Sequence, residues 1–128
     1  MDTIPFRADT ELHLIRGGDT YHTLQTEIAD TDSSRQRGLM ERAPLTDEQA
    51  MLFVFDVAGP QTFWMANTPS ALDIAFVAGD STILNVAKYV RPNTTSGVSS
   101  EGAAKYVLEV RAGFADTYGM SRGDRIRW

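Results

Sequence analysis

Two runs of β-favouring residues on either side of a short polar turn occupy the middle of the chain. The run at 72–77 has the sequence LDIAFV, and a second run at 82–90 follows the Gly79-Asp80 pair. Apolar, β-branched and aromatic residues around a Gly-Asp pair are typical of a β-hairpin, because glycine accepts the backbone angles of a tight turn. We therefore expect an antiparallel strand pair here, which requires further strands beside it to form a stable sheet.

The other predicted elements are also short. We expect strands at 11–16, 21–29, 51–55, 62–65, 105–111 and 125–128, and helices at 33–40 and 112–118. The spacing of Thr46 and Gln49 is that of a capping box and predicts a helical turn. The residues 91–102 contain Pro92, Asn93, Gly97 and three serines and predict an exposed loop. The fold class expected is α+β: a mainly antiparallel sheet, closed as a compact barrel or packed as a sandwich, with two short helices.

Size and composition restrict both domain number and function. The 128 residues fit one domain covering 1–128, with residues 1–10 as a flexible N-terminal segment. Hydrophobic residues make up 42% and charged residues 23%, as in ordinary globular proteins. The net charge of -5 argues against nucleic acid as a partner, because a phosphate backbone needs a basic surface. The absence of cysteine excludes disulfides, thiolate metal sites and cysteine nucleophiles.

The sequence leaves the compartment open. Its longest apolar run, Ala50–Phe55, is far shorter than the roughly twenty residues of a membrane-spanning helix. Its first residues lack the basic start and apolar stretch of a secretory signal. The protein is therefore either cytoplasmic, or periplasmic or extracellular if a signal has been removed. We expect a monomer or a weak oligomer.

Several motifs in a fixed order point to a family. They are RQRGLMER at 35–42, MLFVF at 51–55, FWMANT at 63–68, LDIAF at 72–76, YVLEV at 106–110 and the pair Gly123-Asp124. In this order they resemble the prokaryotic domain of unknown function family 192, over residues 27–125. The resemblance implies a small, mainly antiparallel β domain that is often found in exported proteins. It implies no established activity, substrate or cofactor.

The residues themselves offer few of the usual catalytic patterns. His13 and His22 do not have the spacing of a metal site, and zinc usually needs three or four protein ligands. No glycine-rich phosphate loop and no G-x-S-x-G nucleophile motif occurs. We therefore expect neither a metal nor a cofactor.

Trp64 is the first candidate for a binding residue. Alternation along a strand places Phe63 and Met65 on one face and Trp64 on the other, with Asn67 and Thr68 at the strand end. A tryptophan beside an amide is typical of a pocket for a planar or sugar-like molecule. Alternatively, Trp64 closes a small second core beneath a loop.

Asp73 is the second candidate, because it interrupts an apolar strand. A carboxylate there must face solvent or be paired, since its burial alone would be costly. Arg35 and Arg42 could reach it, as arginine suits bidentate pairing with a carboxylate. Such a pair either fixes the segment 35–42 against the sheet, or belongs to a pocket with Trp64 and Asn67 at its rim.

Three functions remain open at this point. We favour a small, soluble, non-enzymatic accessory domain that binds a small molecule or a protein, because no nucleophile–base pair is visible. Its candidate ligand-binding residues are Arg42, Trp64, Asn67 and Asp73, with Arg35, Thr68 and Glu109 as secondary candidates. The second possibility is a hydrolase or lyase that uses Asp73 and Glu109 as acid and base. The third is a structural subunit of an envelope assembly.

Overall fold

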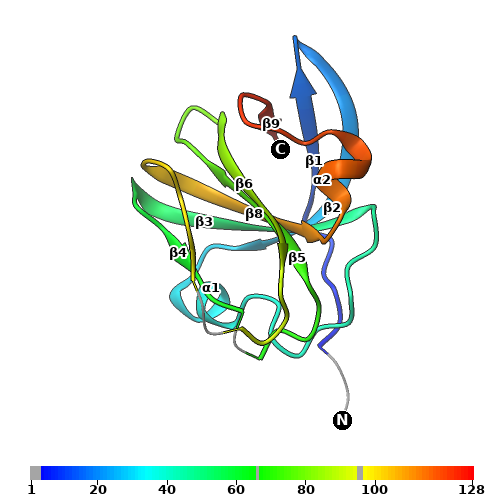
Figure 1. The fold of residues 1–128 in the computed structure, drawn as a ribbon, viewed down its shortest axis with the longest axis vertical. Helices are drawn as coiled ribbons and strands as arrows, with labels where there is room; N and C mark the ends of the chain where they lie inside the picture. The colour runs from blue at the N-terminus through cyan, green and yellow to red at the C-terminus, as the bar shows by residue number, and fades with distance from the viewer. Residues whose placement is uncertain (1–3, 66, 95–96) are drawn as a thin grey trace.

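The computed structural model describes residues 4–65, 67–94 and 97–128. Within them the chain forms nine strands and two short helices. In chain order these are β1 (Thr10–Arg16), β2 (Asp19–Ala29), α1 (Asp32–Arg37), β3 (Gln49–Gly59), β4 (Thr62–Phe63), β5 (Leu72–Val77), β6 (Ile83–Val90), β7 (Val98–Ser99), β8 (Ala104–Arg111), α2 (Phe114–Tyr118) and β9 (Arg125–Arg127). Seven strands share one curled sheet in the order β6-β5-β8-β3-β2-β1-β9, and β4 pairs with β7 separately (Figure 1).

The strand directions explain where α1 lies. The predicted hairpin is confirmed as β5 and β6, joined by a turn in which the Ala78 N–H donates to Thr82 at 2.9 Å. β2 and β3 run parallel, whereas the other described pairs run antiparallel. A parallel pair needs a crossover connection between its strands. The segment 30–48, which contains α1, is this crossover.

The two edges of the large sheet meet at one end. Leu14 of β1 pairs with Ile126 of β9. Arg125 of β9 forms a bridge with Thr82, and the Ile83 N–H donates to the Asp124 carbonyl at 2.8 Å. The sheet therefore curls into a half-barrel, as Figure 1 shows. The predicted α+β class with a mainly antiparallel sheet is confirmed.

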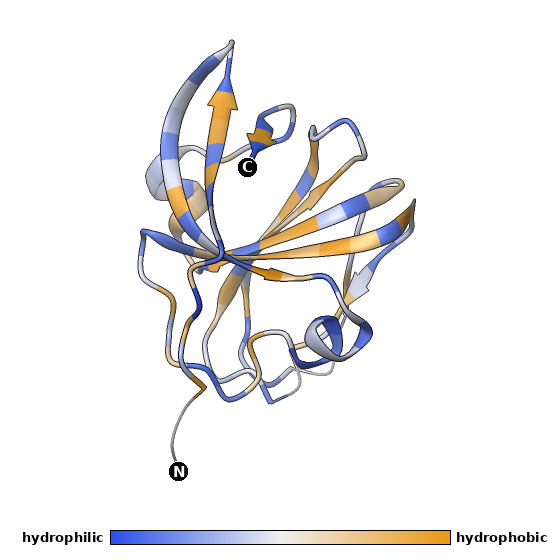
Figure 2. Cartoon of the chain, turned by 180° about the vertical axis from the view of Figure 1, so that it is seen from behind, coloured by the Kyte–Doolittle hydropathy of each residue, from blue (hydrophilic) through white to orange (hydrophobic). Residues whose placement is uncertain are grey.

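Both faces of the sheet are covered by apolar side chains. On the inner face, Leu12, Leu14, Leu24, Leu52 and Leu108 of the sheet form one core cluster with Phe114 of α2. On the outer face, Phe53, Ile74, Phe76 and Val107 of the sheet form a second cluster with Leu39 of the crossover and Met65, which follows β4. Figure 2 shows hydrophobic strands beside a mostly hydrophilic α1. In the apolar run 51–55, predicted to be buried on both sides, residues 51–53 are buried and Val54 and Phe55 are partly buried.

The helices are shorter than predicted, for local reasons. α1 is capped reciprocally by Thr31 and Ser34 and stops before Gly38, which has a φ of 49°. A Cβ at Gly38 would lie 3.2 Å from the Phe53 ring, so the turn needs glycine. α2 begins only after Gly113, which has a φ of 92°, and ends at Gly119 as predicted.

Three other details differ from the prediction. The helical turn expected at Thr46–Gln49 is a single hydrogen-bonded turn, with the Gln49 N–H donating to the Thr46 carbonyl at 3.1 Å. The strand expected at 62–65 ends at Phe63. The loop expected at 91–102 contains β7, because Val98 and Ser99 pair with β4.

The N-terminal segment runs beside β2. The backbone N–H of Arg7 donates to the Glu27 carboxylate at 2.8 Å, and Ile4 forms a bridge with Arg42. Residues 1–3 of the segment predicted to be flexible lie outside the described residues. In the part of the chain that is described, no helix is long and apolar enough to cross a membrane.

Candidate functional site

A groove lies on the outer side of the sheet, between α1 with the turn after it and the start of β4. It has a volume of about 390 Å³. We call it the Trp64 groove; its lining includes Arg35, Gln36, Met40, Phe55, Phe63 and Trp64. Trp64 is 60% exposed, a large fraction for a tryptophan. The groove therefore presents an aromatic surface to solvent.

The packing of β4 explains why Trp64 points outward. Phe63 packs edge-on against Phe53, with ring centroids 4.8 Å apart, and Met65 is buried. Trp64 follows the end of β4 between these two residues, and its side chain is largely exposed to solvent. The predicted pattern of a buried Met65 and an outward Trp64 is found, although the strand predicted to produce it ends at Phe63. The alternative in which Trp64 seals a second core is wrong.

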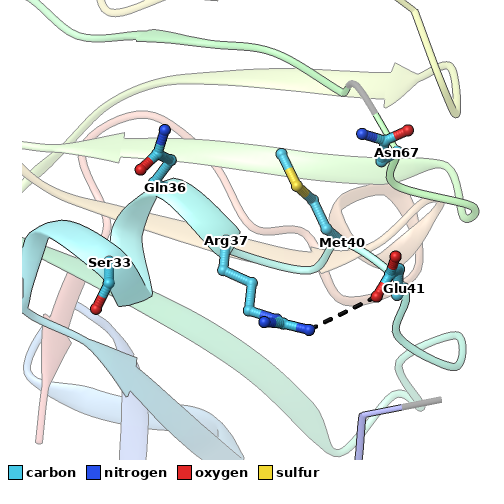
Figure 3. Close-up of a pocket in the computed structure, with 6 residues that line it drawn as sticks. All are labelled: Ser33, Gln36, Arg37, Met40, Glu41 and Asn67. Carbon is cyan, nitrogen blue, oxygen red and sulfur yellow. Dashed lines mark ion pairs between the residues drawn. The ribbon is translucent and has the colours of Figure 1, made fainter.

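A second hollow adjoins the Trp64 groove along α1. It also measures about 390 Å³ and shares Gln36 and Met40 with the groove. Figure 3 shows Met40 and Asn67 on one side of it and Arg37 extending toward Glu41, with which it forms an ion pair at 3.6 Å. Asn67 thus lies next to the groove and not in its lining.

A small recess of about 40 Å³ lies beneath the groove, and Glu109 is part of its wall. We call it the Glu109 recess; it also touches the Gly38 turn, Phe63, Trp64 and Thr68. Glu109 is only 4% exposed. Burial raises the pKa of the Glu109 carboxyl to about 8. The carboxyl is therefore mainly protonated at neutral pH.

Glu109 and Asp73 lie on opposite faces of the sheet. In the antiparallel β5–β8 pair, Glu109 is opposite Ile74, an outer-face residue, and Asp73 is opposite Val110, an inner-face residue. Residues directly opposite each other share a face. The hypothesis that Asp73 and Glu109 act together as acid and base is therefore wrong.

Asp73 has a structural role in the inner core. Its fully buried carboxylate accepts hydrogen bonds from the N–H groups of Tyr89 (2.8 Å), Ala115 (2.9 Å) and Gly113 (3.2 Å). Gly113 and Ala115 lie at the start of α2, where backbone N–H groups lack partners within the helix. The predicted ion pair of Asp73 with Arg35 or Arg42 is wrong, because main-chain donors occupy the carboxylate.

The two arginines have other partners. Arg42 forms two hydrogen bonds to Glu27, each 2.8 Å long, beside and not inside the Trp64 groove. Arg35 lies on the groove wall, where it donates to Asp32 at 2.7 Å and to the Val54 carbonyl at 2.7 Å. Its guanidinium lies 5.6 Å from the Phe55 ring centroid. Arg35 thus joins the crossover to β3.

The structure brings together only part of the predicted site. Trp64, Arg35, Thr68 and Glu109 surround the groove and its recess. Asn67 lies in the neighbouring hollow, and Arg42 and Asp73 lie elsewhere, so the predicted common rim is not formed.

Sequence reasoning missed several groove residues. These are Gln36, Met40, Phe55, Gln61 and Phe63. They come from three separate elements that meet only because the crossover folds over the outer face. The predicted helix at 33–40 covered two of them, and it did not indicate that Gln36 and Met40 line a groove.

Another cluster of polar side chains lies at α2. Asp47 pairs with Arg111 and accepts a hydrogen bond of 2.9 Å from the Tyr118 hydroxyl, and His22 packs on the Tyr118 ring. These contacts join α2 to the end of the crossover. Among the described residues, no three His, Asp or Glu side chains are placed to hold a metal ion.

Comparison with known proteins assigns the chain to a family. Residues 13–128 match DUF192, described as "Uncharacterized ACR, COG1430". The chain belongs to this family. A search of the curated proteins finds no match.

Two solved structures are similar in both sequence and fold. One is from Sinorhizobium meliloti 1021 and is described as a "putative transcription regulator". It is 36% identical, with a TM-score of 0.87 and 91% of each chain covered. The other is a protein of unknown function from Novosphingobium aromaticivorans DSM 12444. It is 32% identical, with a TM-score of 0.87, covering 92% of this chain and 84% of that one.

Proposed function

We propose that this chain is a non-enzymatic binding domain whose Trp64 groove takes a small uncharged ligand with a planar or sugar-like ring. The observation that carries this proposal is the 60% exposure of Trp64 beside Phe55, Phe63 and Met40 in one groove. Exposed aromatic surface in a concave site favours stacking with a flat ring. A volume of about 390 Å³ is within the usual range for small-molecule sites.

The charges around the groove favour an uncharged ligand. The Arg35 guanidinium already binds Asp32, and Arg37 is paired with Glu41. The side-chain amides of Gln36 and Gln61 form no hydrogen bond with the described part of the chain, so they are free to bind polar groups of a ligand. Neutral amides beside an aromatic ring suit a neutral polar molecule.

A small molecule is a better partner for this surface than a nucleic acid. The net charge of -5 opposes binding to a phosphate backbone, although one similar structure is described as a regulator. Because the family resemblance implies frequent export, an accessory role in the cell envelope accompanies this proposal.

Fluorescence of Trp64 tests the proposal directly. Trp128→Phe leaves Trp64 as the sole tryptophan. We expect toluene, benzamide or methyl β-glucopyranoside to change its emission saturably. In ligand-observed NMR, Trp64→Ala should abolish binding, whereas Tyr89→Ala, which removes an exposed aromatic outside the groove, should not. Absence of saturable binding for all three probes, or full binding by Trp64→Ala, would overturn the proposal.

A further inference from the structure

The carboxyl of Glu109 has no bonding partner in the described part of the chain. The other buried carboxylates all have partners: Asp73 accepts three backbone N–H groups, Glu27 binds Arg42, and Asp124 binds Arg16 and Tyr21. Buried polar groups are nearly always hydrogen-bonded in folded proteins. Glu109 therefore stands out as a group whose hydrogen bonds are not used by the fold.

The position of Glu109 relates it to the Trp64 groove. The Glu109 recess shares Arg35, Gln36, Met40, Phe63 and Trp64 with the groove above it. Its volume of about 40 Å³ is close to the space that one water molecule takes in the liquid. A single small polar group of a ligand therefore fits beside Glu109 while the rest of the ligand remains in the groove.

Few charges face this carboxyl. The neighbouring strands present Met51 from β3 and Ile74 from β5, which are uncharged. The crossover contributes Arg35 and Arg37 to the recess, and both already pair with other side chains, Asp32 and Glu41. The β4 side contributes only uncharged residues. Burial alone accounts for the raised pKa of Glu109.

A protonated carboxyl offers an O–H donor beside a carbonyl acceptor. A carboxamide has the matching acceptor and donor, so the two can form paired hydrogen bonds. An ammonium group would enter past two guanidinium groups, and a carboxylate would find no unpaired cation among the described residues of the recess. An uncharged amide-like group fits this environment best.

We infer that Glu109 is the polar anchor of the Trp64 groove and hydrogen-bonds an uncharged carboxamide or carbonyl group of a ligand whose ring lies on Trp64. This inference rests on the proposed function and names the chemistry of its ligand. Glu109 selects the polar group, and Trp64 selects the ring.

Four probes with the same ring distinguish the contribution of Glu109 from that of Trp64. Toluene carries the ring alone, benzamide adds the carboxamide, and benzylammonium and benzoate add charges. In the Trp128→Phe protein at neutral pH, we expect benzamide to bind about tenfold more tightly than toluene, as one good buried hydrogen bond allows. Benzylammonium and benzoate should bind more weakly than benzamide.

Two substitutions then test the role of Glu109. Glu109→Gln keeps a donor and an acceptor, so it should retain benzamide binding. Glu109→Leu keeps the volume and should reduce benzamide binding to the level of toluene. In the Trp128→Phe protein, benzamide affinity should fall about tenfold from neutral pH to pH 9, one unit above the pKa of Glu109. With Glu109→Gln added it should not change with pH.

The outcomes distinguish failure of the role of Glu109 from failure of the groove as a binding site. Equal binding of toluene and benzamide, or benzamide binding that survives Glu109→Leu, overturns the role of Glu109 and leaves the groove intact. Absence of binding by all four probes overturns the inference, and the proposed function falls with it only if methyl β-glucopyranoside also fails to bind. If Glu109→Leu does not fold, the pH dependence with and without Glu109→Gln decides.

Discussion

The carboxylate of Glu27 binds the guanidinium of Arg42 through two hydrogen bonds of 2.8 Å, and both side chains are almost buried. The hydrogen bonds to Arg42 and to the Arg7 backbone lower the pKa of Glu27, although burial, the largest single influence, raises it. This pair joins the crossover to β2 and so fixes the crossover against the outer face of the sheet.

Breaking the pair should destabilise the protein strongly. Glu27→Ala leaves a buried guanidinium without its partner and should lower the free energy of unfolding by roughly 3 kcal/mol or more. The double variant Glu27→Leu with Arg42→Met should recover most of this loss, because it removes both buried charges. Urea denaturation measures both changes. A loss below about 1 kcal/mol for Glu27→Ala would show that the pair behaves like an exposed one.

Asp73 should be needed for the attachment of α2. Asp73→Ala removes the acceptor of three backbone N–H groups in the inner core, so the free energy of unfolding should fall by roughly 3 kcal/mol. Asp73→Asn keeps one oxygen and should cost less. Asp116→Asn, a change at an exposed carboxylate on α2 itself, is the matched control and should cost far less than either. Equal stability of Asp73→Ala and the wild type in urea would refute this role.

Trp64 should behave as a solvent-accessible tryptophan. In the Trp128→Phe protein, its emission should be red-shifted and efficiently quenched by acrylamide, because 60% of the residue is exposed. Binding of a ring in the groove should protect it from the quencher. Blue-shifted emission that resists acrylamide would contradict the position of Trp64 on the groove wall.

Glu109 should make the protein less stable as the pH rises. Its pKa is raised from 4.5 to about 8 in the folded state, so unfolding releases a proton between these two values. The stabilisation is therefore complete at low pH and is lost as the pH increases toward 8. From about pH 5 to about pH 7.5 the wild type should lose roughly 3 kcal/mol relative to Glu109→Gln. Parallel stability curves for the two proteins would show that Glu109 is not buried.

Local sequence patterns predicted the strands well and the outward direction of Trp64. These features depend on neighbouring residues in the chain: Phe63 and Met65 are the better core residues, and Trp64 between them is left outside. The partners of Asp73 could not be predicted, because Gly113 and Ala115 lie about forty residues away and meet it only through the β5–β8 register. The sequence showed that Asp73 needed partners and could not identify the donors.

Glu109 illustrates the same limit. Its neighbours Leu108 and Val110 indicated a buried strand, but which face it occupied depended on pairing with β5 and β3. The crossover that makes the recess is also defined by the parallel β2–β3 pair. Site residues that depend on register were therefore beyond prediction, whereas those that depend on alternation were not.

The bridge between β9 and the start of β6 has a consequence for how the chain folds. Hairpins such as β1–β2 and β5–β6 involve neighbouring segments and can form early, whereas Leu14 and Ile126 are separated by most of the chain. Contacts between such distant segments slow folding, because a long loop must close first. Until β9 docks, the curled sheet leaves one end of its inner face uncovered. Any conformation in which β9 is undocked therefore presents that end of the inner face to other unfolded chains.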